Sequence, residues 1–99
     1  MTNSDIEFLT TLENIIRQRL EDKPDDSYTA KLVAQGDKRV AQKVGEEAIE
    51  LALATTAGDR DEQLEEAADL IYHLLVLLVS KKISLSDVNE ILRQRHASA

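Results

Sequence analysis

Cysteine is absent from this 99-residue sequence, and turn-forming residues are scarce, with one proline and three glycines. Without cysteine the chain can form neither a disulfide nor a thiolate zinc site, so a reducing cytoplasm is the expected compartment. Strand-like alternation of apolar and polar residues is also missing, and so few turn residues leave helices as the main element. These absences predict an all-α fold.

Long apolar runs and an excess of basic residues are missing as well. The most apolar stretch covers residues 70–79 and includes Tyr72 and His73, so it is too short and too polar to cross a bilayer. Residues 1–5 show no export signal. The 19 acidic and 12 basic side chains give a net charge of −7, which disfavours binding to a polyanion. We therefore expect neither a membrane nor a nucleic acid as a partner.

Apolar periodicity and capping residues predict four to five helices, packed as a bundle in a single domain over residues 1–99. Ser4 and Glu7 fit a capping box, Gly36 fits a left-handed C-cap, and Asp37 and Asp59 fit N-caps. The expected helices run from Ser4 to before Lys23, from after Ser27 to Gly36, from Asp37 to about Ala57, from about Arg60 to Ser80, and from Ser84 or Ser86 to before His96. A domain of this size buries only about two thirds of its unfolded surface, so we expect it to form a homodimer or a higher homo-oligomer.

An acidic side chain falls on the apolar face of the expected helix 37–57. At about 100° per residue, Glu47 lies among the apolar residues of that face, Glu50 lies at its edge and Glu46 lies further round; the apolar residues are Val40, Val44, Leu51 and Ala54. Gly45 costs roughly 1 kcal/mol in a helix relative to alanine, which we interpret as the sign of a close packing contact.

The expected helix 60–80 has two lines of residues. The main apolar stripe comprises Leu64, Ile71, Leu75 and Leu78. Glu66, Asp69 and His73 form a polar line on the opposite face, which we expect to face protein because apolar residues continue it. A histidine in such a place more often makes a core hydrogen bond than binds a metal, so we leave His73 out of the predicted ligands.

Two acidic pairs with i, i+3 spacing therefore lie on helices joined by a short turn: Glu47 with Glu50, and Glu66 with Asp69. Partly buried carboxylates repel one another unless a cation neutralises them, and magnesium favours such oxygen ligands beside phosphates. The sequence thus predicts a magnesium site. The simpler alternative is a solvated acidic helix face.

Four basic residues precede the acidic motif: Lys31, Lys38, Arg39 and Lys43. Lys31 and Lys43 are our candidates for contacts with a metal-bound polyphosphate, Lys43 being the better because it lies one turn before the acids. A solvated role is as frequent for any one of them. Tyr28 can stack on a base, although packing is the commoner role of such a tyrosine.

These motifs resemble the phosphoribosyl-ATP pyrophosphatase family, which belongs to the MazG-like all-α nucleotide pyrophosphatases. The resemblance rests on residues 27–29, Gly36, residues 43–50 with the pattern KVGEEAxE, and residues 66–73 with the pattern EAADLxYH. It implies hydrolysis of phosphoribosyl-ATP to phosphoribosyl-AMP and pyrophosphate, the second step of histidine biosynthesis, by metal-activated water.

The resemblance also implies the roles of the acids. Glu47, Glu50, Glu66 and Asp69 would bind magnesium, with manganese as a substitute, and Glu46 would join Glu47 and Glu50 in catalysis as a residue of the metal shell or one that orients water. Family members assemble as dimers, and this short chain resembles the form that is not fused to the cyclohydrolase of the next step. Two alternatives stay open: a housekeeping nucleoside triphosphate pyrophosphatase, and a non-catalytic helical dimerisation module.

Overall fold

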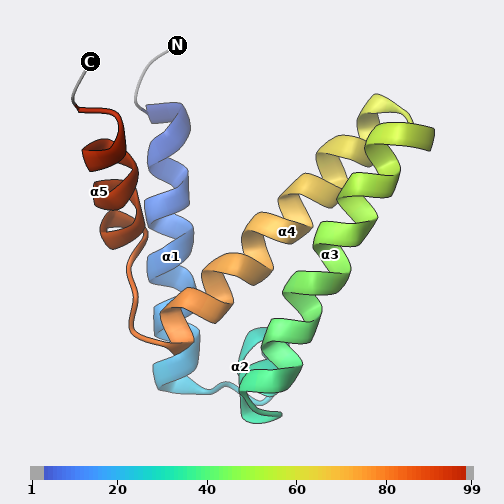
Figure 1. The fold of residues 1–99 in the computed structure, drawn as a ribbon. Helices are drawn as coiled ribbons and strands as arrows, with labels where there is room; N and C mark the ends of the chain where they lie inside the picture. The colour runs from blue at the N-terminus through green and yellow to red at the C-terminus, as the bar shows by residue number, and fades with distance from the viewer. Residues whose placement is uncertain (1–3, 98–99) are drawn as a thin grey trace.

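A computed structural model describes residues 4–97, with side chains from residue 6 onward, and contains five helices and no strand over that range (Figure 1). This confirms the predicted all-α fold. The helices are α1 (Ser4–Asp22), α2 (Tyr28–Ala34), α3 (Asp37–Ala57), α4 (Arg60–Ser80) and α5 (Leu85–Arg95). The capping box predicted at Ser4 depends on a side chain outside the described residues.

Side-chain caps begin three of the helices. The Ser27 hydroxyl accepts a hydrogen bond from the backbone N–H of Ala30, and the Asp59 carboxylate accepts one from that of Glu62. Ser84 and Asp87 form a reciprocal capping box at the start of α5. Each cap satisfies an N–H group that has no partner within the helix. The N-cap predicted at Asp59 is therefore confirmed, and of the two starts predicted for the last helix, Ser84 is the one that the structure shows.

The α2–α3 junction differs from the prediction at two residues. Gly36 has a φ of +105° and a ψ of 164°, outside the left-handed helical region, and it is the N-cap of α3 rather than the C-cap of α2. Gln35 is the C-cap of α2. Asp37 is the first residue of α3, and its carboxylate pairs with Lys81 at the end of α4. Glycine suits this place because side-chain-bearing residues rarely adopt such a positive φ.

The core lies where α1, α2 and α3 meet the C-terminal half of α4. Its buried apolar residues are Ile16, Leu32, Val40, Leu75, Val76 and Val79. The predicted stripe on α4 is wrong in its first half: Leu64 and Ile71 are exposed, while Val76 and Val79 are buried. The reason is that α1 and α2 cover the opposite side of α4, a long-range contact that periodicity within one helix does not reveal.

α3 and α4 form a hairpin that projects away from α1 and α5, so the molecule has two arms (Figure 1). At the tip, the Gln63 side-chain amide donates to the carbonyls of Ala54 and Gly58. A Cβ at Gly58 would lie only 3.0 Å from the Ala54 carbonyl oxygen, so the tight turn leaves little room for a side chain there. At the other arm, the buried Glu13 carboxylate accepts a 2.6 Å hydrogen bond from the Leu85 N–H and fixes the start of α5 against α1.

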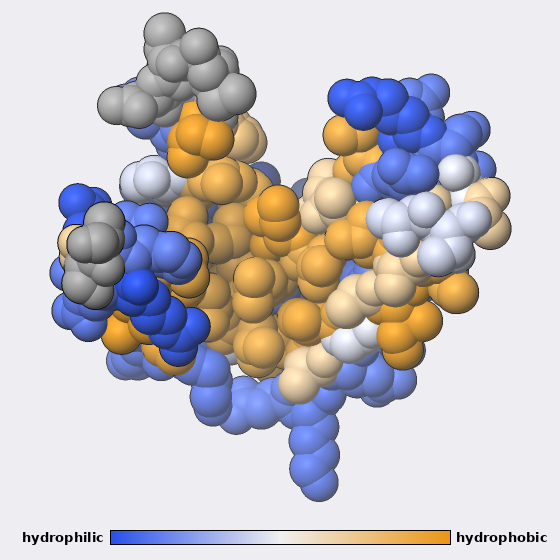
Figure 2. Space-filling model, turned by 45° about the horizontal axis from the view of Figure 1, so that its top comes forward, coloured by the Kyte–Doolittle hydropathy of each residue, from blue (hydrophilic) through white to orange (hydrophobic). Residues whose placement is uncertain are grey.

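The hollow between the two arms is lined by hydrophobic residues (Figure 2). The radius of gyration is 15.0 Å, against about 13 Å for a compact domain of this length. Large apolar side chains remain exposed on both arms, among them Phe8, Ile49, Leu53 and Leu64. Among the described helices, none is long and apolar enough to cross a membrane.

Candidate metal and phosphate site

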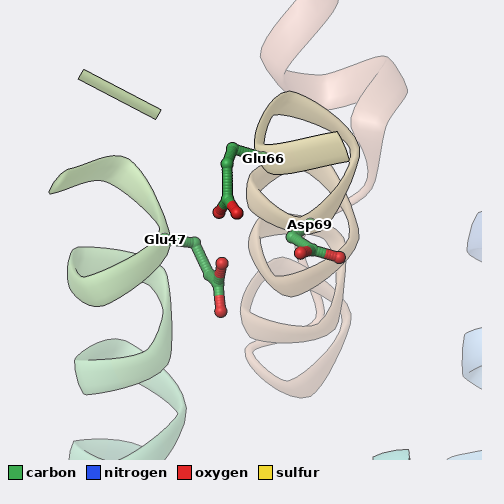
Figure 3. Close-up of side chains that lie close together, drawn as sticks. All are labelled: Glu47, Glu66 and Asp69. Atoms are coloured by element: carbon green, nitrogen blue, oxygen red, sulfur yellow. The ribbon is translucent and has the colours of Figure 1, made fainter. Parts of the chain in front are cut away.

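Three of the predicted acids converge between the two long helices. Glu47 extends from α3 and Glu66 extends from α4 toward one another between the two helices, and Asp69 lies beside them on the face of α4 (Figure 3). One carboxylate oxygen from each residue lies within 4.8 Å of the other two. Glu47 is buried, Glu66 is half-buried and Asp69 is exposed, so the cluster opens to solvent on the Asp69 side. This exposure of Asp69 contradicts our expectation that the whole polar line of α4 faces protein.

Two oxygens of this cluster have no partner. Glu47 Oε2 and Glu66 Oε2 are both buried and neither takes part in a hydrogen bond among the described residues. Leaving a buried charged oxygen unpaired is costly, whereas a divalent cation would satisfy it with the oxygen ligation that magnesium and related ions prefer. The three side chains therefore fit a divalent cation, and the structure brings together three of the four predicted ligands.

Glu50, the fourth predicted ligand, lies beside the cluster on the side of Glu66. Side-chain hydrogen bonding with the neighbouring Glu50 raises the pKa of Glu66, and desolvation and repulsion from Glu50, Glu47 and Asp69 act in the same direction. Glu50 and Glu66 also line a shallow hollow near the hairpin tip. The concentration of negative charge thus extends to all four predicted acids.

Glu46 points to a different set of partners. Its Oε1 lies 3.9 Å from both Arg39 Nη1 and Lys43 Nζ, and its Oε2 accepts a 3.0 Å hydrogen bond from the Gln42 amide. Its side chain is half-exposed and lies outside the three-residue cluster. Glu46 therefore holds two basic residues beside the site. The pairing of Glu46 with Arg39 and Gln42 was not predicted, although Gln42 stands four residues before Glu46, a spacing that places both on one helix face.

Lys43 connects the two groups of acids. Its Nζ lies 3.3 Å from Glu47 Oε1, and the side chain is about one-fifth exposed. Burial acts to lower the pKa of Lys43, but the hydrogen bond to Glu47 and the proximity of Tyr28, Glu47 and Glu46 outweigh it, so the pKa is raised. The ammonium group thus stays charged at neutral pH.

Lys31 lies elsewhere, in a hollow between the end of α1 and α2 that Leu20, Lys23 and Pro24 also line. Among the described residues it makes no ion pair with the acids of the hairpin, so its role in phosphate binding stays a prediction. At Gly45 the predicted packing contact is wrong for residues 4–97, because a Cβ there would meet none of their atoms within 4 Å. Open space faces that part of α3.

His73 makes core hydrogen bonds, as expected. Its Nδ1 lies 2.8 Å from the Asp69 carbonyl oxygen, which can only accept, so Nδ1 is the donor. In a neutral ring Nε2 then accepts the 2.8 Å hydrogen bond from the Tyr28 hydroxyl. Next to this pair, the Thr29 and Tyr72 hydroxyls hydrogen-bond to each other. Two side-chain contacts thereby hold α2 against the helix that carries Glu66 and Asp69.

Comparison with known proteins bears on this arrangement. A profile of the family described as phosphoribosyl-ATP pyrophosphohydrolase matches residues 9–96. Similar curated proteins include histidine biosynthesis bifunctional protein HisIE of Photobacterium profundum, 55% identical over 90% of this chain and 43% of the relative. The HisIE proteins of Vibrio cholerae and Escherichia coli are 50% and 55% identical over 94% and 90% of this chain, and over 44% of each relative.

The chain thus spans less than half the length of these bifunctional relatives, whereas the family profile covers nearly all of the chain. The match includes every motif on which the resemblance rested, from residue 27 to residue 73. It confirms the predicted family resemblance. The chain therefore belongs to the phosphoribosyl-ATP pyrophosphohydrolase family.

Proposed function

We propose that this domain hydrolyses phosphoribosyl-ATP to phosphoribosyl-AMP and pyrophosphate in histidine biosynthesis, with magnesium held by Glu47, Glu50, Glu66 and Asp69. Family membership supports the reaction. The observation that carries the site is the convergence of three carboxylates within 4.8 Å, two of them with buried oxygens that lack a partner. Manganese, which accepts similar oxygen ligands, is expected to substitute.

A bound magnesium ion would supply phosphate binding and activation of water. The protein side chains would divide the remaining tasks. Glu47 and Glu66 anchor the site because they are the less exposed ligands, while exposed Asp69 leaves the solvent side open for the triphosphate. Glu46 holds Arg39 and Lys43 at the rim, where positive charge would stabilise the departing pyrophosphate. Glu46 would then act on the substrate through these cations, besides its predicted role in the metal shell or in orienting water.

We also propose that the domain works as a homodimer. The open shape, the hydrophobic hollow between the arms and the exposed Ile49, Leu53 and Leu64 all leave apolar area uncovered in one chain. The exposed area is 7240 Å², whereas a compact monomer of 11.1 kDa exposes about 5,700 Å². The open space at Gly45 would let a second backbone approach α3.

Residues 1–99 are proposed to form a single domain, because α1 to α4 share one core and Glu13 fixes α5 to α1. A cytoplasmic location is proposed from the lack of cysteine, which suits a reducing compartment. Substrate binding by Lys31 belongs to the same proposal: its hollow lies on the α2 side, from which a long substrate could be contacted.

The test is pyrophosphate release from phosphoribosyl-ATP in the presence of magnesium, with ordinary nucleoside triphosphates in parallel. Glu47→Gln should abolish release, whereas Glu65→Gln, the same chemical change at an exposed neighbour of Glu66, should not. Release from ordinary triphosphates only would favour a housekeeping pyrophosphatase. No release from any substrate would favour the non-catalytic dimerisation module.

A further inference from the structure

Among the described residues, Lys43 is the one basic residue whose side chain pairs with the carboxylate of a proposed metal ligand. Over residues 6–97, no other lysine, arginine or histidine lies within 4 Å of the carboxylates of Glu47, Glu50, Glu66 or Asp69. The contact involves one oxygen only: Lys43 Nζ is 3.3 Å from Glu47 Oε1, while Glu47 Oε2 has no hydrogen-bond partner in the described part of the chain. A single ammonium group therefore neutralises a small part of the negative charge in this cluster.

The position of Lys43 conflicts with a divalent cation on the same carboxylate. Magnesium binds carboxylate oxygens at about 2.0–2.1 Å and has strict octahedral geometry, so an ammonium hydrogen-bonded to Glu47 would crowd and repel it. Lysine has a flexible four-carbon stem, and this side chain keeps contact with solvent. It can therefore leave Glu47 without a change in the helix.

Glu46 provides the alternative partner for the displaced ammonium. Its Oε1 is already 3.9 Å from Lys43 Nζ and equally far from Arg39 Nη1, and Gln42 holds its other oxygen. Because Glu46 stands outside the three-ligand cluster, Lys43 could remain paired with it after release from Glu47. Lys43 and Arg39 would then lie together beside an incoming polyphosphate.

We propose that Lys43 is an exchangeable counter-ion that competes with the divalent cation for Glu47 in the empty site and turns to the phosphates of the substrate once the cation is bound. The inference rests on the metal site of the proposed function. The simpler interpretation, an i, i+4 helix pair that contributes little energy, predicts almost no change in the binding of metal or substrate when Lys43 is replaced. The exchange predicts two changes of opposite sign. Removing the ammonium should strengthen metal binding and weaken substrate binding.

The experiment measures binding of Mn²⁺ alone, without substrate, by calorimetric titration of the full chain. Lys43→Met removes the charge and keeps an unbranched stem, and we expect it to bind Mn²⁺ at least about fivefold more tightly than wild type, at the lower end of ordinary coupling between sites. Lys43→Arg, which keeps the charge, should stay close to wild type. Lys38→Met is the matched control, since Lys38 is exposed on the same helix and makes no ion pair with the cluster.

The second measurement is steady-state hydrolysis at saturating metal, where Lys43→Met should raise KM for phosphoribosyl-ATP. Tighter Mn²⁺ binding together with a higher KM supports the exchange. Unchanged or weaker Mn²⁺ binding in Lys43→Met, with wild type binding Mn²⁺ normally, overturns it and leaves the proposed function intact. If wild type itself binds no Mn²⁺, the metal site of the proposed function fails and the exchange fails with it.

Discussion

Replacing Glu47 by glutamine is expected to stabilise the metal-free protein and to remove most of its stabilisation by magnesium. In the empty site, the Glu47 carboxylate lies within 4.8 Å of ligand oxygens from Glu66 and Asp69. Coulomb's law with an effective dielectric constant of about 20 gives roughly 3.5 kcal/mol of repulsion for one such pair of full charges. A glutamine amide removes this repulsion and can donate to a neighbouring carboxylate.

Two effects reduce this gain in stability. Glu66 is only half-buried and Asp69 is exposed, so solvent screens part of the repulsion, and the ion pair between Glu47 and Lys43 is lost. Partly exposed ion pairs of this kind contribute about 0.2–1 kcal/mol. We therefore expect the free energy of unfolding in EDTA to rise by about 1–2 kcal/mol. In a domain of this size, each kcal/mol raises Tm by roughly 4–8 °C.

With magnesium the order of stability should reverse. A ligand present at a hundred times its dissociation constant stabilises the folded state by about 2.7 kcal/mol, and the Glu47→Gln variant should lose most of that gain. The assay is a thermal melt of both proteins at one protein concentration, in EDTA and across a magnesium titration. Glu65→Gln controls for the loss of one negative charge and should follow wild type in both solutions. A Glu47→Gln variant that is less stable than wild type in EDTA would refute the reasoning.

Three further outcomes follow from the packing. Ile16→Ala should lower the free energy of unfolding by about 2–5 kcal/mol in urea titrations, because Ile16 is fully buried, whereas Ile15→Ala, at a side chain 38% exposed, should cost clearly less. Tyr28→Phe removes the hydrogen bond to the buried His73 ring and should lower the free energy of unfolding by about 1 kcal/mol in the same titration. No measurable loss would mean that this bond does not form in solution. Hydrogen bonds from the Ser84 backbone N–H and hydroxyl lower the pKa of Asp87 in the folded protein. The ionised Asp87 therefore contributes to stability above the pKa of the unfolded chain, about 4, and this contribution is lost as the pH falls through the lowered pKa of the folded protein. Amide exchange in the first turn of α5 should therefore be faster in Asp87→Asn than in wild type at pH 7, and the difference should vanish in acid.

The acidic cluster could be predicted because its geometry is local. Within one helix, the residue spacing fixes which side chains share a face, so Glu47 was placed correctly among Val40, Val44 and Ala54. Gly58 and Asp59 indicated a short turn, and a short turn forces the next helix to run back beside the first. These two facts together bring Glu66 and Asp69 to Glu47 without any information from distant parts of the chain.

The errors concern contacts between segments far apart in the sequence. Which side of α4 is buried depends on where α1 and α2 pack, and this left Leu64 exposed although its periodicity matched that of a core residue. The buried Glu13 was not predicted, because its partner is a backbone N–H more than seventy residues away. Gly45 has no packing partner in the part of the chain that the structure describes, so a glycine in one sequence can mark a contact with a second molecule or a ligand.

The two-residue connection between α3 and α4 also limits how this domain can change in length. Loops usually tolerate insertions, but here one additional residue in α4 before Glu66 would rotate Glu66 and Asp69 by about 100° about the helix axis and carry them away from Glu47. Length can be added only in matched amounts, as whole turns on both helices beyond the acids. The hairpin tip therefore fixes the register of α4 against α3. Related sequences of different length should lengthen both helices together, so that the four carboxylates keep facing one another.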